Sequence, residues 1–336
     1  MCLDGYRKLA KALNAPPMLT EVLPLIVKHN QIELLVCLSE KEQSVAELAS
    51  VLNLPRISLE SMIDELFKAG FLKKKKNREI RYSVKPFQSI VNRFLSENRA
   101  QLLGKHAASL AKLRLEEHVS KAKTNPHPEG KVLPIPEAYM EPTSIVVPHE
   151  SAINVLEKAR SFSLRDCECR MTYRNCDKPV ETCLGLNEFS DELVERGVAK
   201  EISLEEAKKV LKIANEHGLV HQVIYSDWLR GEVSDMCSCC PCCCMHLRAL
   251  FDYGVKHHIA KSGYIAVVDS EKCAGCGACV NRCMFHARKI HDGKSIVVED
   301  KCYGCGLCTA TCPKSATKLS ISQHALGCAS IHFASH

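Results

Sequence analysis

The chain has 336 residues, 21 of them cysteine, and a formal net charge of +6 at pH 7. Only Cys2 and Cys37 precede residue 167, and the thiol density beyond that point excludes both an ordinary enzyme core and, at this length, a small disulfide-bonded secreted domain. Charges begin at Asp4, where a signal peptide needs an apolar stretch, and no apolar run reaches the roughly 18 residues of a membrane span. We therefore expect a cytoplasmic protein with reduced thiols.

The first third of the chain is basic and shows helical periodicity. Through residue 125 it has 21 Lys and Arg against 13 Asp and Glu. Ser44-Val45-Ala46-Glu47 has the pattern of a capping box, and the apolar stripe behind it stops at Pro55. Short helices followed by a basic hairpin predict a winged helix-turn-helix. The predicted elements are helices over 31–38, 45–52 and 58–69, a polar turn over 73–78 and a strand over 79–84.

In element order and length, residues 20–90 resemble MarR-type regulators and also the N-terminal dimerisation domains of small-molecule O-methyltransferases. The first resemblance implies that the helix over 58–69 enters the DNA major groove while the hairpin contacts phosphates. The second implies a homodimer. Glu60, Asp64 and Glu65 on the same helix would repel phosphate, which favours dimerisation or docking over DNA binding. The candidate DNA or partner contacts are Lys73, Lys74, Lys75, Lys76 and Arg78.

A central block contains ten cysteines in two groups, with a helix predicted between them from the capping box at 203–206 to Gly218. Neighbouring residues of an extended segment point to opposite sides, so the run 242–244 is not expected to direct every sulfur to one cluster. We predict an iron–sulfur cluster shared between the two groups, with a four-thiolate zinc site as the alternative. The ten are Cys167, Cys169, Cys176, Cys183, Cys237, Cys239, Cys240, Cys242, Cys243 and Cys244.

The block resembles a segment that accompanies a C-terminal ferredoxin domain in iron–sulfur proteins of anaerobic prokaryotes. That resemblance implies cofactors but no substrate. Among the cysteines, Arg170, Arg174 and Lys178 are interpreted as solvated surface, the alternative being that they offset thiolate charge. His246 is interpreted as a polar helical residue rather than a ligand, and the pair 257–258 has no recognisable metal spacing.

Near the C-terminus, one cysteine spacing, C-x2-C-x2-C-x3-C, occurs twice, 29 residues apart. Two glycines in each loop allow three thiolates to converge on one cluster while backbone amides point at its sulfurs. The fourth cysteine lies a helical step further on, and β-branched residues precede each run. The first run is Cys273, Cys276, Cys279 and Cys283, and the second is Cys302, Cys305, Cys308 and Cys312.

Residues 262–320 resemble a bacterial two-cluster ferredoxin. The resemblance implies two [4Fe–4S] clusters and that the fourth cysteine of each run ligates the cluster of the other run. Cluster one then has Cys273, Cys276, Cys279 and Cys312 as ligands. Cluster two has Cys283, Cys302, Cys305 and Cys308. Two structural zinc sites are the alternative. The first run has Met284 where the second has Pro313, and because proline is not a ligand, the assignment of ligands is unchanged.

These features predict an α+β multidomain chain. Six prolines between residues 124 and 149 argue against helix or central strand there and indicate a linker. The predicted parts are a winged-helix domain with flanking helices over 1–123, a Pro-rich linker over 124–149, a mostly helical cysteine-rich metal-binding domain over 150–261, a small pseudo-symmetric two-cluster ferredoxin-like domain over 262–320 and a tail over 321–336.

We predict a protein of anaerobic metabolism that relays single electrons through two [4Fe–4S] clusters to or from the central metal centre and a redox partner protein. One alternative is a redox- or iron-responsive winged-helix transcriptional regulator. Another is a reductase or cofactor-activating subunit with chemistry at the central cluster. No acid–base constellation identifies catalytic residues or a substrate.

Overall fold

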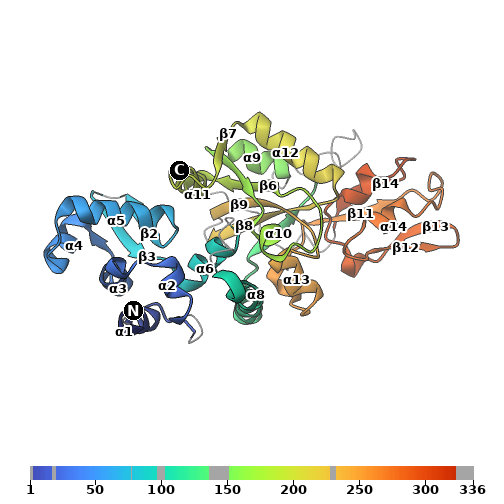
Figure 1. The fold of residues 1–336 in the computed structure, drawn as a ribbon. Helices are drawn as coiled ribbons and strands as arrows, with labels where there is room; N and C mark the ends of the chain where they lie inside the picture. The colour runs from blue at the N-terminus through green and yellow to red at the C-terminus, as the bar shows by residue number, and fades with distance from the viewer. Residues whose placement is uncertain are drawn as a thin grey trace. The chain divides into compact units, whose positions relative to one another are not determined.

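The structure is a computed structural model that describes residues 3–16, 20–76, 78–96, 103–135, 151–227 and 232–322. The chain divides into two compact units, residues 1–116 with 195–198, and residues 117–194 with 199–336. Figure 1 shows the elements of both. Cys2, Cys328, residues 136–149 of the predicted linker and the tail from residue 323 lie outside the described residues. No helix in the described ranges is long and apolar enough to cross a membrane.

The first unit combines helices with a three-stranded antiparallel sheet of order β1-β3-β2. Apolar side chains from its helices form one core with Phe71 and Leu72. Its elements are α1 (Leu3–Ala12), α2 (Leu23–Ile26), η2 (His29–Gln31), α3 (Ile32–Glu40), β1 (Gln43–Ser44), α4 (Val45–Leu52), α5 (Arg56–Lys68), β2 (Leu72–Lys76), β3 (Ile80–Val84), α6 (Phe87–Ser96), η3 (Gly104–His106) and α8 (Ala107–Thr124), whose residues from 117 belong to the second unit.

Local sequence signals account for the start of α4. Ser44 Oγ accepts a hydrogen bond from the Glu47 amide at 3.4 Å, and Glu47 Oε2 accepts one from the Ser44 amide at 2.7 Å. Two backbone donors of the first turn are thereby satisfied, as the capping box predicts. Helix α5 begins at Arg56, two residues before the predicted start, because Pro55 takes the N-cap position.

The polar turn predicted over 73–78 is wrong for most of its length, since Lys73–Lys76 belong to β2. In the antiparallel ladder Lys73 pairs with Ser83 and Lys75 with Arg81. Strand β2 lies at an edge of the sheet, where lysine side chains reach water while the backbone completes the ladder. A run of four lysines is therefore compatible with a strand, although its composition is typical of a turn.

The second unit contains a seven-stranded sheet of order β10-β4-β8-β9-β6-β5-β7. All neighbouring strands are antiparallel except β10 and β4, which are parallel. The prediction of a mostly helical middle domain is therefore wrong. The strands are β4 (Gly130–Leu133), β5 (Phe162–Asp166), β6 (Glu181–Leu186), β7 (Lys200–Ile202), β8 (Val220–Asp227), β9 (Glu232–Cys239) and β10 (Ile259–Ala260).

Strand β4 lies within the stretch predicted to be a linker. Its residues pair with β8 over Gly130–Leu133 and with β10 over Gly130–Lys131. Prolines of this stretch fall outside the strand, so every residue of β4 keeps the amide that a ladder needs. The proline-rich segment therefore contains an inner strand of the sheet.

Helices α9 and α12 pack on the sheet. Their buried Leu156 and Leu211 share a core with Leu184 of β6 and Met236 of β9, and Figure 1 shows both helices along one side of the strands. Ser203 begins α12 with the predicted capping box. The helices of this unit outside the ferredoxin repeats are α9 (Ala152–Lys158), α10 (Glu168–Tyr173), α11 (Asn187–Glu195), α12 (Leu204–Glu216), α13 (Met245–Phe251) and η6 (Lys256–His258).

The two cysteine runs at the C-terminal end form a pair of similar half-units. Strand β11 (Tyr264–Val268) pairs with β14 (Thr317–Ile321), and β12 (Arg288–His291) pairs with β13 (Lys294–Val297), both antiparallel. A short helix follows the first two cysteines of each run and contains the third: α14 (Ala278–Arg282) and α15 (Leu307–Ala310). The predicted β-branched strands are thus present as β11 and β13.

Replacement of Ser203 by Ala removes the side-chain acceptor of the Glu206 amide, which lies 3.2 Å away. We expect the free energy of unfolding to fall by about 1 kcal/mol, the typical cost of an N-cap, as measured by urea unfolding followed by circular dichroism. Lys212→Ala, an exposed position on the same helix, is the control and should leave the value within about 0.5 kcal/mol. Equal losses in the two variants would contradict the role of the cap.

Candidate metal centres

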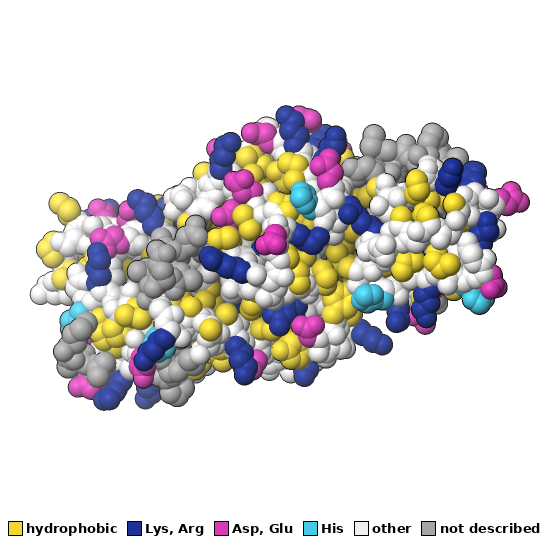
Figure 2. Space-filling view, turned by 45° about the vertical axis from the view of Figure 1, so that its right-hand side comes forward, with side chains coloured by type: hydrophobic (Ala, Val, Ile, Leu, Met, Phe, Trp, Pro, Cys, Tyr) yellow, Lys and Arg dark blue, Asp and Glu magenta, His cyan; other side chains and the backbone are white. Residues whose placement is uncertain are grey.

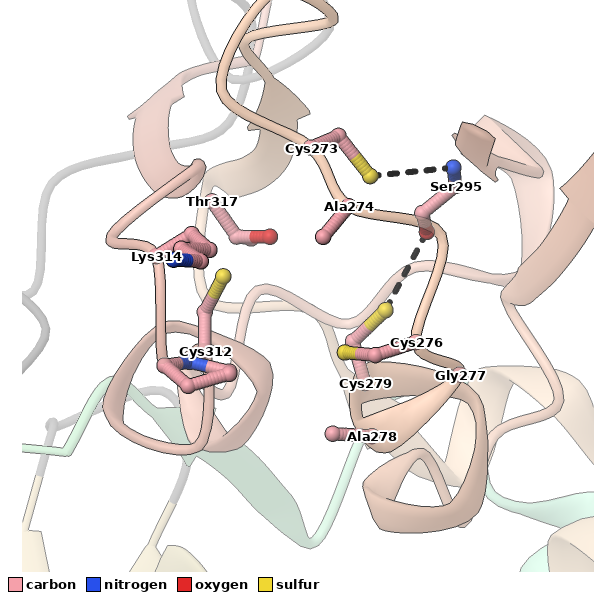
Figure 3. A pocket seen from close by; sticks show the side chains of 11 residues that line it. Cys273, Ala274, Cys276, Gly277, Ala278, Cys279, Ser295, Cys312, Lys314 and Thr317 are labelled. Atoms are coloured by element: carbon pink, nitrogen blue, oxygen red, sulfur yellow. Dashed lines mark hydrogen bonds between the residues drawn. The ribbon is translucent and has the colours of Figure 1, made fainter. Parts of the chain in front are cut away.

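The four cysteines predicted to bind cluster one line a single pocket. Cys273 and Cys276 come from the loop that leads into α14, Cys279 lies in the first turn of α14, and Cys312 follows α15. Figure 3 shows their sulfur atoms around the same space. Cys276 is exposed, whereas Cys273 and Cys279 are buried. The donor set fits a [4Fe–4S] cluster, which takes four thiolates.

Hydrogen bonds from the protein favour the ionised sulfurs that iron needs. The Ser295 amide donates to Cys273 Sγ at 3.3 Å, and the Ser295 hydroxyl lies 3.1 Å from Cys279 Sγ. The Ser295 and Gly275 amides hold the pKa of the Cys273 thiol below its usual value. Stabilised thiolates are the form that binds metal.

The second set, Cys283, Cys302, Cys305 and Cys308, also converges in one place. Burial raises the pKa of the Cys308 thiol to about 12, and the nearby Cys302 and Cys283 add to the rise. Burial likewise raises the pKa of Cys305. A buried thiol with thiol neighbours loses its proton only when a cation compensates the charge, so this set too fits a cluster.

The two sets repeat each other in detail. The Ala287 amide donates to Cys283 Sγ at 3.4 Å, and the Ala316 amide donates to Cys312 Sγ at 3.2 Å. Both pairs are four residues apart, and the second pair lies 29 residues after the first. The fourth cysteine of each run therefore has the same backbone support.

Glycine is required where the cysteine loops pass close to other backbone. Gly275 and Gly304 have φ of +68° and +66°. A Cβ at Gly304 would collide with the Tyr264 carbonyl and the Ser262 hydroxyl, and one at Gly275 with the Gly293 carbonyl. The loops thus reach their conformation only without a side chain at these positions.

The central block divides into two sets of thiols. We call the first the four-cysteine set: Cys176, Cys240, Cys242 and Cys243. Their sulfur atoms all lie within 4.8 Å of one another. The separation is 3.8 Å between Cys176 and Cys240, 3.9 Å between Cys176 and Cys243, and 3.9 Å between Cys242 and Cys243.

These separations match one tetrahedral ion. With metal–sulfur bonds of about 2.3 Å, the edge of a tetrahedron of four thiolates is about 3.8 Å. Burial and the neighbouring Cys240 and Cys176 raise the pKa of the Cys242 thiol to about 12, which shows the cost of crowding the sulfurs without a cation. The last turn of α12 covers the set, since Ala214 packs against Cys240 and Cys243.

The other six thiols form the six-cysteine set: Cys167, Cys169, Cys183, Cys237, Cys239 and Cys244. Strands β6 and β9 bring Cys183 and Cys237 together, with their sulfurs 3.7 Å apart. Cys239 interacts with Cys237 and Cys244, and Cys169 interacts with Cys167 and Cys244. The hydrogen bond with Cys237 and burial raise the pKa of the Cys183 thiol.

Two arginines accompany these thiols, Arg170, which is buried, and Arg165, which is partly buried. Arg170 is 2% exposed and donates to the Ser238 carbonyl at 2.9 Å, to Thr182 Oγ1 and to Cys240 Sγ. The interpretation of Arg170 as solvated surface is therefore wrong, whereas Arg174 is exposed as expected. The sequence analysis missed Arg165, which forms ion pairs with Glu168 at 2.7 Å and Asp235 at 2.5 Å.

Comparisons with known proteins find a similarity in the C-terminal region that contains the two cysteine runs. Residues 272–317 match the family model of the 4Fe-4S dicluster domain. Ferredoxin-2 of Desulfomicrobium norvegicum is 44% identical over 34 residues, which are 10% of this chain, and the match spans 58% of the length of that ferredoxin. No solved structure matches the chain. The C-terminal region is thus a ferredoxin-type 4Fe-4S domain.

Gly304→Ala tests whether the loop geometry is needed for a cluster. Gly254 has a similar φ of +71° but open space around it, so Gly254→Ala is the matched control. We expect this control to lower the free energy of unfolding only by the penalty for a side chain in left-handed backbone, about 1 to 2 kcal/mol. We expect Gly304→Ala to lose about four irons per chain and Gly254→Ala to lose none, as measured by iron and sulfide analysis of protein purified without oxygen. The same iron content in both variants would contradict the close-approach argument.

Proposed function

We propose that this protein transfers single electrons through two [4Fe–4S] clusters, to or from a metal centre in the central cysteine block. Cluster one is assigned to Cys273, Cys276, Cys279 and Cys312, and cluster two to Cys283, Cys302, Cys305 and Cys308. When bound, such clusters exchange one electron at a time. The ferredoxin-type domain and the pocket around the first four cysteines support this assignment.

One observation carries the relay. Cys239 and Cys244 of the six-cysteine set share a buried core with Cys308 and the partly buried Cys305 of the second cluster set. The Ile135 amide, just after β4, donates to the Cys305 carbonyl at 3.0 Å, so the sheet is tied directly to a cluster loop. A metal centre in the six-cysteine set would therefore be bound by cysteines of the same apolar core as the ligands of cluster two.

A buried cation stands beside both cluster sets. Arg288 is 3% exposed and donates to Thr317 Oγ1 at 3.1 Å. Its charge favours the thiolate of Cys273 in the first set. In the second set, where burial raises the pKa of Cys283 and Cys308, the charge of Arg288 opposes the rise. Its Nε and Nη1 have no hydrogen-bond partner among the described residues. Arg288 is thus positioned to offset the negative charge of either cluster with its ligands.

We assign different metals to the two central sets. The four-cysteine set has the sulfur spacing of a single tetrahedral ion, and we propose Zn²⁺ with a structural role beneath α12. The six-cysteine set supplies more thiols than one ion needs and adjoins cluster two, so we propose a third iron–sulfur cluster there. Arg165 is positioned to offset thiolate charge at Cys183 and Cys237, and Arg170 at Cys167, Cys239 and Cys240.

The exposed Cys276 puts the edge of cluster one at the surface, where a redox partner protein can approach it. Lys314 lines the same pocket, and Lys294 Nζ donates to the Cys273 carbonyl at 2.7 Å. These lysines favour an acidic patch on the partner. We expect salt to weaken this association, because exposed charges are screened.

Metal counting under anaerobic conditions tests the assignments. We expect about twelve irons per chain from the three proposed clusters and one zinc bound by the four-cysteine set. Cys239→Ser should lose about four irons and keep its zinc, whereas Cys176→Ser should lose the thiolate-bound zinc and keep its iron. Electron delivery from a chemical reductant to an acceptor dye should fall in Cys239→Ser only. About eight irons in the unaltered protein would overturn the third cluster, and the absence of a reversible one-electron couple would overturn electron transfer itself.

For the first unit we propose a winged helix that pairs with a second copy of the chain rather than with DNA. Its basic residues have acidic partners: Lys74 and Lys76 lie 2.5 Å and 3.4 Å from Glu195 oxygens, and Arg81 lies 2.7 Å from Glu47. On the face that Figure 2 shows, Lys and Arg are scattered among Asp and Glu rather than gathered in one stripe. Ile57 and Val51, by contrast, are 82% and 63% exposed.

Ile57→Asp tests the homodimer. A charge in an apolar contact between copies is costly, so we expect the variant to shift toward monomer in analytical ultracentrifugation. Lys75→Ala, which lowers the net charge by the same one unit at another exposed position, is the control and should stay dimeric. A gel shift with the DNA upstream of the gene is expected to show no specific complex. A monomeric unaltered protein, or a specific salt-sensitive complex with that DNA, would replace this proposal with the regulator.

A further inference from the structure

Three histidines and one glutamate, none of them a member of a cysteine set described above, meet in the second unit. His118 lies in α8, Glu129 lies just before β4, His246 lies in the first turn of α13 and His258 ends η6. These segments are far apart in the sequence. One ligand atom from each residue lies within 4.8 Å of the ligand atoms of the others.

The contacts converge on one ring nitrogen of His258. Its Nε2 lies 2.9 Å from His118 Nε2 and 3.0 Å from His246 Nδ1. Glu129 Oε2 lies 4.0 Å from the same atom. A neutral imidazole nitrogen either donates or accepts one hydrogen bond, so one hydrogen bond cannot account for both nitrogen contacts of this atom.

The same spacing is close to that of ligands around one ion. With metal–nitrogen bonds of about 2.0 to 2.1 Å, two ligand nitrogens of a tetrahedral site are about 3.3 Å apart. His258 is fully buried, and burial disfavours the charged imidazolium, so it favours the neutral form that binds metal. The Glu129 side chain is 32% exposed, so water and ions reach the cluster from its side.

The surroundings hold these ligands in place without using them. His257, the neighbour of His258, points elsewhere and contacts the Ala122 carbonyl of α8 at 2.8 Å, which anchors η6 against that helix. The Glu129 amide donates to the His258 carbonyl at 3.1 Å. Two of the four residues are thus fixed by their backbones as well as by their side chains.

We propose that His118, Glu129, His246 and His258 form a second kind of metal site, which binds one divalent transition-metal ion of the zinc class through three imidazoles and one carboxylate. Nitrogen and oxygen donors distinguish this site from the thiolate sets. Imidazole suits Zn²⁺ and similar borderline ions, whereas thiolates bind Zn²⁺ and also hold iron–sulfur clusters. The ion would fasten α8, the entrance to β4, α13 and η6 to one another.

The test uses the full chain, purified without oxygen and dialysed against a small excess of Zn²⁺ followed by buffer, so that the site has been offered metal. We expect His118→Gln and His246→Gln each to lose about one zinc per chain with iron content unchanged. His257→Gln, a histidine of the same 3-10 turn outside the set, is the matched control and should keep the zinc. Circular dichroism and the iron content establish that each variant is folded.

X-ray absorption at the zinc edge separates this site from the four-cysteine set. In Cys176→Ser the remaining zinc should have nitrogen and oxygen neighbours at about 2.0 to 2.1 Å, and in His246→Gln it should have only sulfur at about 2.3 Å. Folded His118→Gln and His246→Gln proteins that retain all their zinc, or a Cys176→Ser protein without nitrogen-bound zinc, would overturn the proposal. If Cys176→Ser loses no zinc while the histidine variants do, the thiolate assignment fails and the histidine site stands.

Discussion

Thiols packed against thiols are the constraint on which the second unit depends. No cysteine that the structure describes forms a disulfide, and six of the central sulfurs lie less than 4 Å from another sulfur. Two unit charges about 4 Å apart repel by roughly 4 kcal/mol at an effective dielectric constant of about 20. Protonated thiols avoid this repulsion, but a metal ion removes it and gains four bonds. The crowding of the cysteines is thus the physical reason for the metal centres proposed above.

The sheet turns this constraint into an ordered arrangement. In β9 the alternation of a strand separates Cys237 and Cys239 from the intervening Ser238, whose carbonyl accepts from Arg170. Cys240 follows the end of the strand and belongs to the four-cysteine set. A single segment therefore serves two sets of ligands, and the buried arginine between them offsets charge from both.

Features encoded by short-range physics were predictable from the sequence. The capping boxes at Ser44 and Ser203 are present, and the repeated cysteine spacing identified the ferredoxin-type domain. The middle domain was not predictable in the same way, because its strands β6 and β9 are rich in Cys, Ser and Thr and show little apolar alternation. The histidine set was missed because His118 and His258 are 140 residues apart, and only the tertiary fold brings them together.

The place of β4 has a consequence for how such a protein can evolve. The strand is encoded next to the first unit, yet it pairs on both edges with strands of the metal-binding sheet, and Glu129 immediately precedes it. A gene fusion or deletion with its breakpoint in the proline-rich stretch after β4 would therefore separate a sheet from one of its own inner strands. The continuous part of the first unit, residues 1–116, can be exchanged without cutting the second unit only at a breakpoint before residue 117. The composition boundary at the prolines is therefore not the structural boundary.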